Sequence, residues 1–392
     1  NSVIALYSKG QIQEALDAVE TLTKSYPNEA LLFNISGACF AGLRQLDNAL
    51  KSYDKALTIK PDYAEVHYNL GVTLQELGQL NAAVKSYEQA LFIKPDYAIA
   101  CNNLGLTLQK LGQLNAAVKS YEQALVIKPD YADVHNNRGN ALKDLGQLDA
   151  AVKSYKQALA INPNYADAYN NLGVTLQELG QHDAAVKSFE KATAIKPNFA
   201  DAHYNLGNVL KKLNQLDAAV KCFEQALAIK PDYADAHNNL GNALKDLGQL
   251  DAAVKCYEKA VAIKPDYAQV HQNHGSAMNR LKQLDKALQS FERALVLNPE
   301  LNFLLGDLLH SKMLLCLWDD LPNDLNELQN KINNNEKVIE PFSMLGLIDD
   351  PELQRKVAEI FTNKNHPKNH DLPEIGLYPK HKKIRIGYFS AD

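Results

Sequence analysis

The apolar residues of positions 64–97 fall into two stretches with helical spacing. The first stretch predicts an amphipathic helix, because its large side chains recur every three or four residues: His67, Leu70, Leu74 and Leu77. A second helix is predicted by the stripe Ala82, Ala83, Tyr87, Ala90 and Leu91. Gly78 separates the two stretches, and glycine readily takes the left-handed conformation that ends a helix. Pro95 follows the second stretch and cannot continue it.

This helical pair recurs along the chain with a fixed period. Nine prolines stand 34 residues apart: Pro27, Pro61, Pro95, Pro129, Pro163, Pro197, Pro231, Pro265 and Pro299. A glycine column (from Gly37 to Gly275) and an alanine column (from Ala83 to Ala287) keep the same register. A period of this length predicts an array of helical pairs that stack into a solenoid with a long concave face. The small residues Gly71 and Ala83 are expected to let the paired helices approach to about 8–10 Å.

Helix ends vary among the copies. Asn81, Asp149 and Asp217 occupy equivalent positions and are predicted to cap the second helix of their copies. Asn214 and Lys282 replace the turn glycine. Asparagine tolerates left-handed backbone well, whereas lysine does so less, so the turn at Lys282 is expected to differ from the others.

With Tyr87 in its aromatic column and Pro95 at its end, the unit resembles the tetratricopeptide repeat. Seven full copies occupy residues 64–301, after a partial copy at 1–29 and a divergent one at 30–63. The resemblance implies an all-α fold, a right-handed superhelical solenoid of about nine repeats over residues 1–301. Residues 302–382 are expected to form a helical cap and linker. Residues 383–392 predict a strand, because they are rich in strand-forming side chains.

Composition narrows the possible partners. The 392 residues carry a net charge of −5 with lysines spread among acids, which argues against nucleic-acid binding. Neither an apolar run of membrane length nor a signal peptide is recognisable, so no membrane partner is expected. The five cysteines form no CxxC pair and predict free thiols in a reducing compartment, the cytoplasm. The chain begins at Asn1 without a methionine, and we expect it to be a piece of a longer protein.

Three segments beyond the repeats carry a second resemblance: LCLWDD (315–320), PFSMLGLIDDPELQRKVAEIF (341–361) and IRIGYFSAD (384–392). They look like the part of the bacterial O-linked N-acetylglucosamine transferase family that joins the repeats to the catalytic half. The resemblance implies a parent enzyme that transfers a sugar from UDP-N-acetylglucosamine to Ser or Thr of acceptor proteins. Residues 383–392 would open the first of its two Rossmann-like lobes. This chain stops before the catalytic and donor-binding residues of that family, so no catalytic, cofactor or metal site is expected in it.

Two polar columns are the candidate binding site. One consists of asparagines in the middle of the first helix: Asn69, Asn103, Asn137, Asn171, Asn205, Asn239 and Asn273. An amide offers donors and an acceptor that suit an extended peptide backbone. Four residues earlier, on the same helical face, stands an acid column: Glu65, Asp133, Asp167, Asp201 and Asp235. In the transferases that this chain resembles, such columns hold acceptor proteins in the concave groove.

The same residues have a purely structural interpretation. Asparagine at this position can simply satisfy neighbouring backbone groups, and acids in a first turn favour the helix dipole. Ile99 and Gln269 interrupt the acid column, and Ile35 ends the asparagine column. Both interpretations stay open from sequence alone.

Other hypotheses are a histidine metal site, a non-catalytic scaffold, a different donor sugar and a homodimer formed through the convex side. The histidines recur once per copy: His67, His135, His203, His237 and His271. Successive copies stack about 10 Å apart, too far for one ion to bind two of them, so core packing is the favoured role. A scaffold that assembles proteins would use the same concave groove without any enzyme attached.

Overall fold

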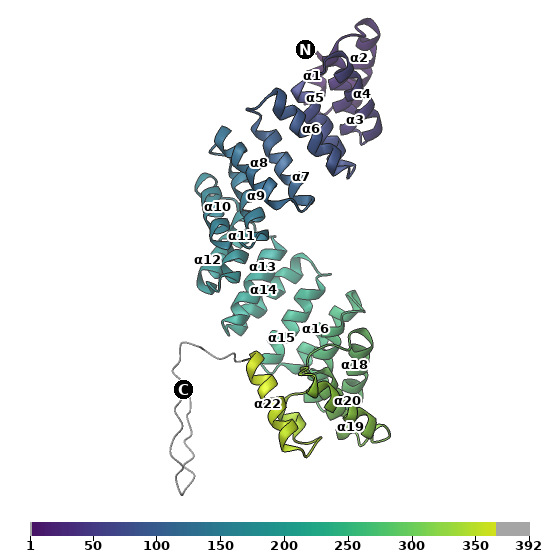
Figure 1. Cartoon of the computed structure of the whole chain (residues 1–392), viewed down its shortest axis with the longest axis vertical. Helices are drawn as coiled ribbons and strands as arrows, with labels where there is room; N and C mark the ends of the chain where they lie inside the picture. Colours follow the sequence, from purple (N-terminus) through teal and green to yellow (C-terminus); the bar gives the residue numbers. More distant parts are fainter. Residues whose placement is uncertain (1, 366–392) are drawn as a thin grey trace. The chain divides into compact units, whose positions relative to one another are not determined.

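The computed structural model describes residues 2–365, and within them the chain is entirely helical (Figure 1). The helices are α1 (Ser2–Ser8), α2 (Ile12–Ser25), α3 (Ala30–Gly42), α4 (Leu46–Ile59), α5 (Ala64–Glu76), α6 (Leu80–Ile93), α7 (Ala98–Lys110), α8 (Leu114–Ile127), α9 (Ala132–Asp144), α10 (Leu148–Ile161), α11 (Ala166–Glu178), α12 (His182–Ile195), α13 (Ala200–Lys212), α14 (Leu216–Ile229), α15 (Ala234–Asp246), α16 (Leu250–Ile263), α17 (Ala268–Arg280), α18 (Leu284–Leu297), α19 (Leu304–Leu314), α20 (Leu321–Asn333), α21 (Pro341–Met344) and α22 (Pro351–Asn365). The all-helical solenoid of repeated pairs predicted from the sequence is confirmed for this part of the chain.

The expected strand at 383–392 and the end of the expected linker, 366–382, lie outside the described residues. The proposed domain boundaries therefore stay predictions. None of the helices within 2–365 combines the length and the apolar character needed to cross a membrane.

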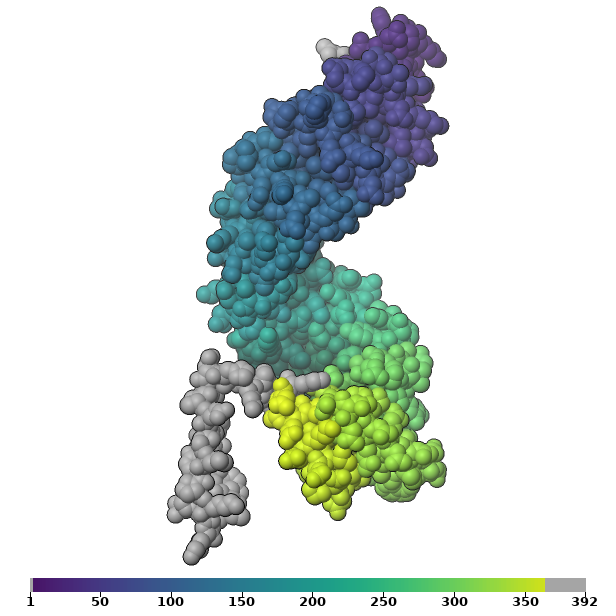
Figure 2. Space-filling model, in the orientation of Figure 1, coloured from purple at the N-terminus to yellow at the C-terminus, as the bar shows by residue number. Residues whose placement is uncertain are grey.

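The chain divides into two compact units, Asn1–Ala243 and Leu244–Asp392, and the boundary falls within α15. In the first unit, the two helices of each copy pack against each other, and the second helix packs against the first helix of the next copy. First helices also touch the first helices of adjacent copies, from α3 to α13. Second helices make no comparable contact with one another among the described residues. The first helices therefore form one crowded surface, the inner face, and Figure 2 shows neighbouring copies (purple to teal) packed without gaps.

In seven copies, the two helices are held together by an aromatic ring lying against a glycine. Tyr87 of α6 is fully buried, and a β-carbon added at Gly71 of α5 would stand 2.7 Å from its Cε1 atom. Such a distance is too short for any side chain larger than hydrogen. The same contact recurs in other copies: Gly37 with Tyr53, Gly105 with Tyr121, Gly139 with Tyr155, Gly173 with Phe189, Gly207 with Phe223 and Gly275 with Phe291. The glycine column therefore makes room for a ring.

The turns between paired helices all use left-handed backbone. Gly78 has φ +74°, as expected. Asn214 (φ 59°) and Lys282 (φ 62°) take the same conformation. The prediction that the Lys282 turn differs is therefore wrong. Packing of the flanking helices fixes the turn, and the lysine adopts the strained conformation that this requires.

The predicted capping residues of the second helices are also wrong. Gln79 and Gln147 precede the helices α6 and α10, and neither makes a side-chain capping bond. Asn81 and Asp149 lie one residue inside their helices. An aspartate there still stabilises the helix, because its charge lies beside the positive end of the helix dipole.

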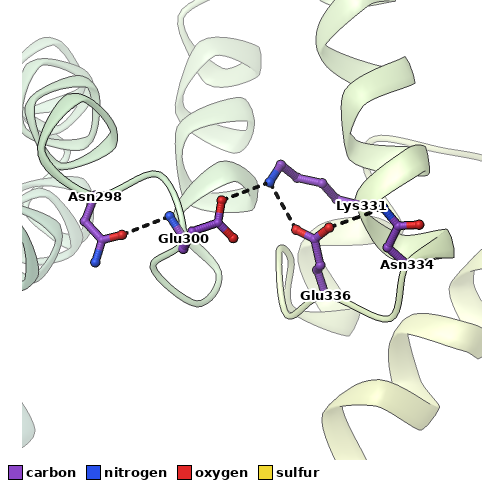
Figure 3. A network of polar contacts seen from close by, with 5 residues as sticks. All are labelled: Asn298, Glu300, Lys331, Asn334 and Glu336. Carbon is purple, nitrogen blue, oxygen red and sulfur yellow. Dashed lines mark hydrogen bonds and ion pairs between the residues drawn. The ribbon is translucent and has the colours of Figure 1, made fainter.

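After the repeats, the second unit continues with α19 to α22 around a separate apolar cluster that includes Leu309, Leu328, Ile332 and Met344. The chain enters α19 through Phe303, whose backbone N–H donates to Lys337 O at 2.7 Å. Polar contacts lie beside this junction (Figure 3). Lys331 Nζ of α20 is 3.0 Å from Glu336 Oε2 and 3.7 Å from Glu300 Oε1. This lysine ties the turn after α18 to the end of α20.

Candidate peptide-binding face

The asparagine column lies on the first helices of its copies, and every member is half-buried. In the first unit, its side chains link neighbouring copies. Nδ2 of Asn137 donates to Asn102 Oδ1 at 3.0 Å, and Nδ2 of Asn171 donates to Asn136 Oδ1 at 3.1 Å. Asn69 and Asn205 make the same bond, to Asn34 and Asn170. These bonds go to side chains of the preceding copy, whereas the structural interpretation expected neighbouring backbone groups.

The partners form a second column that the sequence reasoning missed, here called the bridging column: Asn34, Tyr68, Asn102, Asn136, Asn170 and Tyr204. Each precedes a member of the asparagine column by 35 residues. Where the bridging residue is tyrosine, its hydroxyl accepts the bond. Asn103 Nδ2 lies 3.1 Å from Tyr68 Oη, and Asn239 Nδ2 lies 3.1 Å from Tyr204 Oη. The repeated Asn-Asn pairs in the sequence, such as Asn136-Asn137, were a signal that could have revealed this column.

An asparagine amide has two N–H donors and an acceptor oxygen, so a single hydrogen bond leaves a donor and an acceptor available. Within residues 2–365, the second N–H group and the Oδ1 atom of Asn137 and Asn171 have no protein partner. Both side chains are only half-buried, so these groups are accessible from the inner face. Asn137 and Asn171, in successive copies, therefore combine a structural bond with unused hydrogen-bonding capacity, whereas the oxygens of Asn103 and Asn239 already accept a bond from the preceding asparagine.

The acid column begins the first helices, and its members Asp133, Asp167, Asp201 and Asp235 are exposed. Two of them also affect the pKa of a tyrosine in the following turn. Burial, and after it a hydrogen bond to Asp133 and the charge of that carboxylate, raise the pKa of Tyr165. Tyr233 has a similarly raised pKa from burial and from Asp201. These acids thus lie at the edge of the inner face with the turn tyrosines beside them.

The second unit contains Asn273, the last member of the asparagine column, and an acid that the sequence analysis did not predict. Asn273 accepts a hydrogen bond from Gln269 Nε2 at 3.3 Å, so the residue that interrupts the acid column contacts the asparagine column. One period later the sequence has Asp307, on α19. Gln272 Nε2 donates to Asp307 Oδ2 at 3.1 Å, which repeats the 35-residue offset. Burial raises the pKa of Asp307 to about 6. The 34-residue period, extended by one copy, points to this residue.

The repeated histidines hold the turns of their copies. Nε2 of His67 lies 2.9 Å from the carbonyl oxygen of Pro61, six residues earlier. His135, His203, His237 and His271 contact their own prolines at 3.0 Å. Among residues 2–365, no group of three or more His, Cys, Asp or Glu side chains is placed to hold a metal ion.

Comparison with known families identifies the repeat. A family model described as TPR repeat matches residues 44–78, 74–112, 108–146, 139–180, 175–214 and 207–248, more than half of the chain. Models described as tetratricopeptide repeat match residues 234–267 and 268–301.

Similar individual proteins share only part of the chain. The peroxisomal targeting signal receptor of Saccharomyces cerevisiae is 30% identical over 70 residues, 18% of this chain and 11% of that receptor. The chain therefore spans only a small part of the length of this relative. Among solved structures, MamA is 30% identical and covers 41% of this chain and 94% of its own, with a TM-score of 0.40. YrrB, described as a TPR protein with an unusual peptide-binding site, is 25% identical and covers 50% and 99%, with a TM-score of 0.44.

Proposed function

We propose, because this chain belongs to the tetratricopeptide repeat family, that it binds partner proteins by taking an extended segment along its inner face. The observation that carries the proposal is the unused donor and acceptor of half-buried asparagine amides in successive copies. An extended segment presents backbone N–H and C=O groups at regular intervals, and amides along the face can pair with both kinds. The exposed acid column runs beside these amides and would contact side chains of the bound segment.

The test separates binding from packing with matched pairs of substitutions. Asn137→Ala with Asn171→Ala removes two bridges between copies together with the groups offered to a ligand. Asn102→Ala with Asn136→Ala removes the same two bridges, but these side chains are buried and offer a ligand little. Peptides selected from a random library would be titrated against both variants and the unchanged chain.

We expect the first variant to lose roughly ten-fold or more in affinity, since each lost hydrogen bond contributes about 1 kcal/mol. The second should bind within about two-fold of the unchanged chain, while both lose similar stability. Equal losses of affinity in the two variants would mean that the asparagine column only packs. Failure of every selected peptide to bind would overturn the proposed function itself.

At a finer level, we propose that the parent protein is an O-linked N-acetylglucosamine transferase-like enzyme, for which this chain selects the acceptor. The support is the resemblance of three segments, 315–320, 341–361 and 384–392. The donor would be UDP-N-acetylglucosamine, bound outside this chain, and the setting would be the cytoplasm. The test incubates the full-length protein with labelled UDP-N-acetylglucosamine and a host lysate. Label on proteins that disappears when residues 64–299 are deleted, with donor hydrolysis retained, supports the proposal. Absence of both transfer and donor binding leaves a scaffold or another donor sugar.

A further inference from the structure

Two tyrosine pairs recur on the inner face of the first unit, four copies apart. In the first, the rings of Tyr68 and Tyr97 have centroids 5.1 Å apart. In the second, the rings of Tyr204 and Tyr233 lie 4.9 Å apart. The copies between them have asparagine in the bridging column and lack such a pair among the described ring contacts. All four tyrosines are half-buried, so each pair presents part of its ring surface to solvent.

Each pair has a fixed position. The aromatic ring on the second helix of the same copy lies against the first tyrosine of each pair. The ring centroid of Tyr87 is 6.0 Å from that of Tyr68, and the centroid of Phe223 is 6.0 Å from that of Tyr204. The hydroxyl of Tyr68 accepts from Asn103, and the hydroxyl of Tyr204 accepts from Asn239. The first tyrosine of each pair is therefore held by packing and by a bond to the asparagine column, and the second lies against the first ring. Such pre-ordered rings lose little conformational entropy when a ligand side chain contacts them.

The surroundings of the two pairs differ in charge. Beside the first pair, Glu65 is already paired with Lys94 at 3.7 Å. The acid column is interrupted in the next copy by Ile99, which is 40% exposed two residues after Tyr97. The border of the first pair thus combines an ion pair without net charge and one exposed apolar side chain, Ile99.

Beside the second pair the acid column is uninterrupted, with Asp201 and Asp235 at its positions in the two copies that the pair joins. After burial, the charges of both carboxylates help to raise the pKa of Tyr233. Lys230 lies over the ring of Tyr233 at 4.6 Å, just as Lys94 lies over the ring of Tyr97 at 4.7 Å, so the two pairs differ in their second acid-column residue, Asp235 in place of Ile99. The second pair therefore has an acidic border.

From this difference, the geometry points to two distinct subsites for one extended partner segment. This inference rests on the proposed function. The Tyr68–Tyr97 pair with Ile99 takes an apolar side chain. The Tyr204–Tyr233 pair with Asp201 and Asp235 takes a lysine or arginine. The charge of the carboxylates attracts the cation, and a cation is also favoured at the face of an aromatic ring. The inner face would then bind a segment in one register and one direction.

The separation of the subsites sets the spacing of the two side chains. Stacked copies lie about 10 Å apart, so four copies span about 40 Å. An extended segment advances about 3.3 Å per residue, so the two side chains are about 12 residues apart. A segment with only half of that spacing cannot reach both subsites at once.

The experiment uses the full chain and labelled synthetic peptides of uncharged background, with binding followed by fluorescence anisotropy. The reference peptide carries leucine and arginine 12 residues apart. Three matched peptides replace the arginine by glutamate, replace the leucine by glycine, or halve the spacing. We expect each change to weaken binding by about three- to ten-fold, with glutamate the most harmful.

Substitutions in the protein assign the effect to the second pair. Asp201→Asn with Asp235→Asn should abolish the preference for arginine over glutamate. Asp183→Asn with Asp217→Asn, exposed acids in the first turns of α12 and α14, should leave it unchanged. Ile99→Asp should let the first subsite accept a second arginine in place of the leucine.

The outcomes are distinguishable from failure of the proposed function. If library-selected peptides bind and respond to the asparagine variants, but charge, leucine and spacing make no difference, then the two subsites are wrong and the proposed function stands. If the selected peptides lack a basic residue, the acidic subsite is also wrong. If no peptide binds at all, the proposed function fails first.

Discussion

Gly71 and Tyr87 are in such close contact that a β-carbon on Gly71 would lie 2.7 Å from the Cε1 atom of the ring. Alanine is the better helix former by about 1 kcal/mol, but here its methyl group cannot be placed unless the buried ring moves. We therefore expect Gly71→Ala to lower the free energy of unfolding by about 1–3 kcal/mol, the usual cost of overpacking.

The measurement is urea unfolding followed by circular dichroism. Gly346→Ala is the control, because its methyl group would meet Met313 Cε at an ordinary distance of 3.5 Å. A Gly71→Ala variant as stable as the unchanged chain would show that the ring can shift at little cost.

Lys282 takes the left-handed backbone that glycine takes in most other copies. For a residue with a β-carbon, this conformation costs about 1–2 kcal/mol. Lys282→Gly should therefore stabilise the second unit, by about 1 kcal/mol after the greater chain entropy of glycine is counted. The reverse change, Gly112→Ala at φ +74° with open space around it, should destabilise by a similar amount. Unfolding midpoints that stay the same in both variants would contradict the assignment of strain to the turn.

Asp307 should make stability fall as pH rises. Its pKa is raised by burial, from an ordinary 3.8 to about 6, with Glu340 adding to the rise and Gln272 and Lys245 opposing it. The folded state therefore binds the proton more tightly than the unfolded state. The stabilisation is complete below the unfolded pKa and is lost as pH rises through the folded one.

Asp307→Asn keeps the oxygen that accepts from Gln272 but cannot ionise. We expect it to stabilise the chain at pH 7 by about 3 kcal/mol and to have little effect near pH 4. The difference between variant and unchanged chain, taken at each pH, removes the contribution of the other titrating groups. A difference that does not change between pH 4 and 7 would count against the buried carboxyl as its origin.

Lys331 ties two segments at the end of the repeats, and its two carboxylate partners differ in exposure. The Glu336 contact is shorter, 3.0 Å against 3.7 Å, and the Glu300 side chain is 72% exposed. A hydrogen bond to Glu336 is the chief reason that the pKa of Lys331 is raised. Lys331→Gln should therefore cost about 1 kcal/mol, and Glu300→Gln only a few tenths. Equal effects of the two substitutions would mean that Glu336 contributes no more than the exposed partner.

The repeat length and the pairing of its helices follow from the sequence, because apolar spacing, turn glycines and prolines all point to one unit. Three details do not follow from it: the capping residues, the turn at Lys282 and the bonds between asparagines of neighbouring copies. The capping prediction failed because Asp149 is compatible with both the cap position and the first turn. The Lys282 turn was set by its neighbours and not by its own preference.

The link from Asn171 to Asn136 depends on how one copy rotates against the next. That rotation arises from packing between helices far apart in the chain, and the pattern within a single copy does not contain it. The 35-residue offset is visible only when successive copies are aligned and compared across their boundary.

The bonds between asparagines bear on how the number of copies can change when the gene is duplicated or deleted in part. Each central copy carries a donor for the copy before it and an acceptor for the copy after it, at equivalent positions. Duplicating or deleting one 34-residue block in the DNA joins a donor to an acceptor of the same kind, so the new junction is like the old one. The length of the inner face can thus change in a single recombination event, without a compensating substitution at the seam.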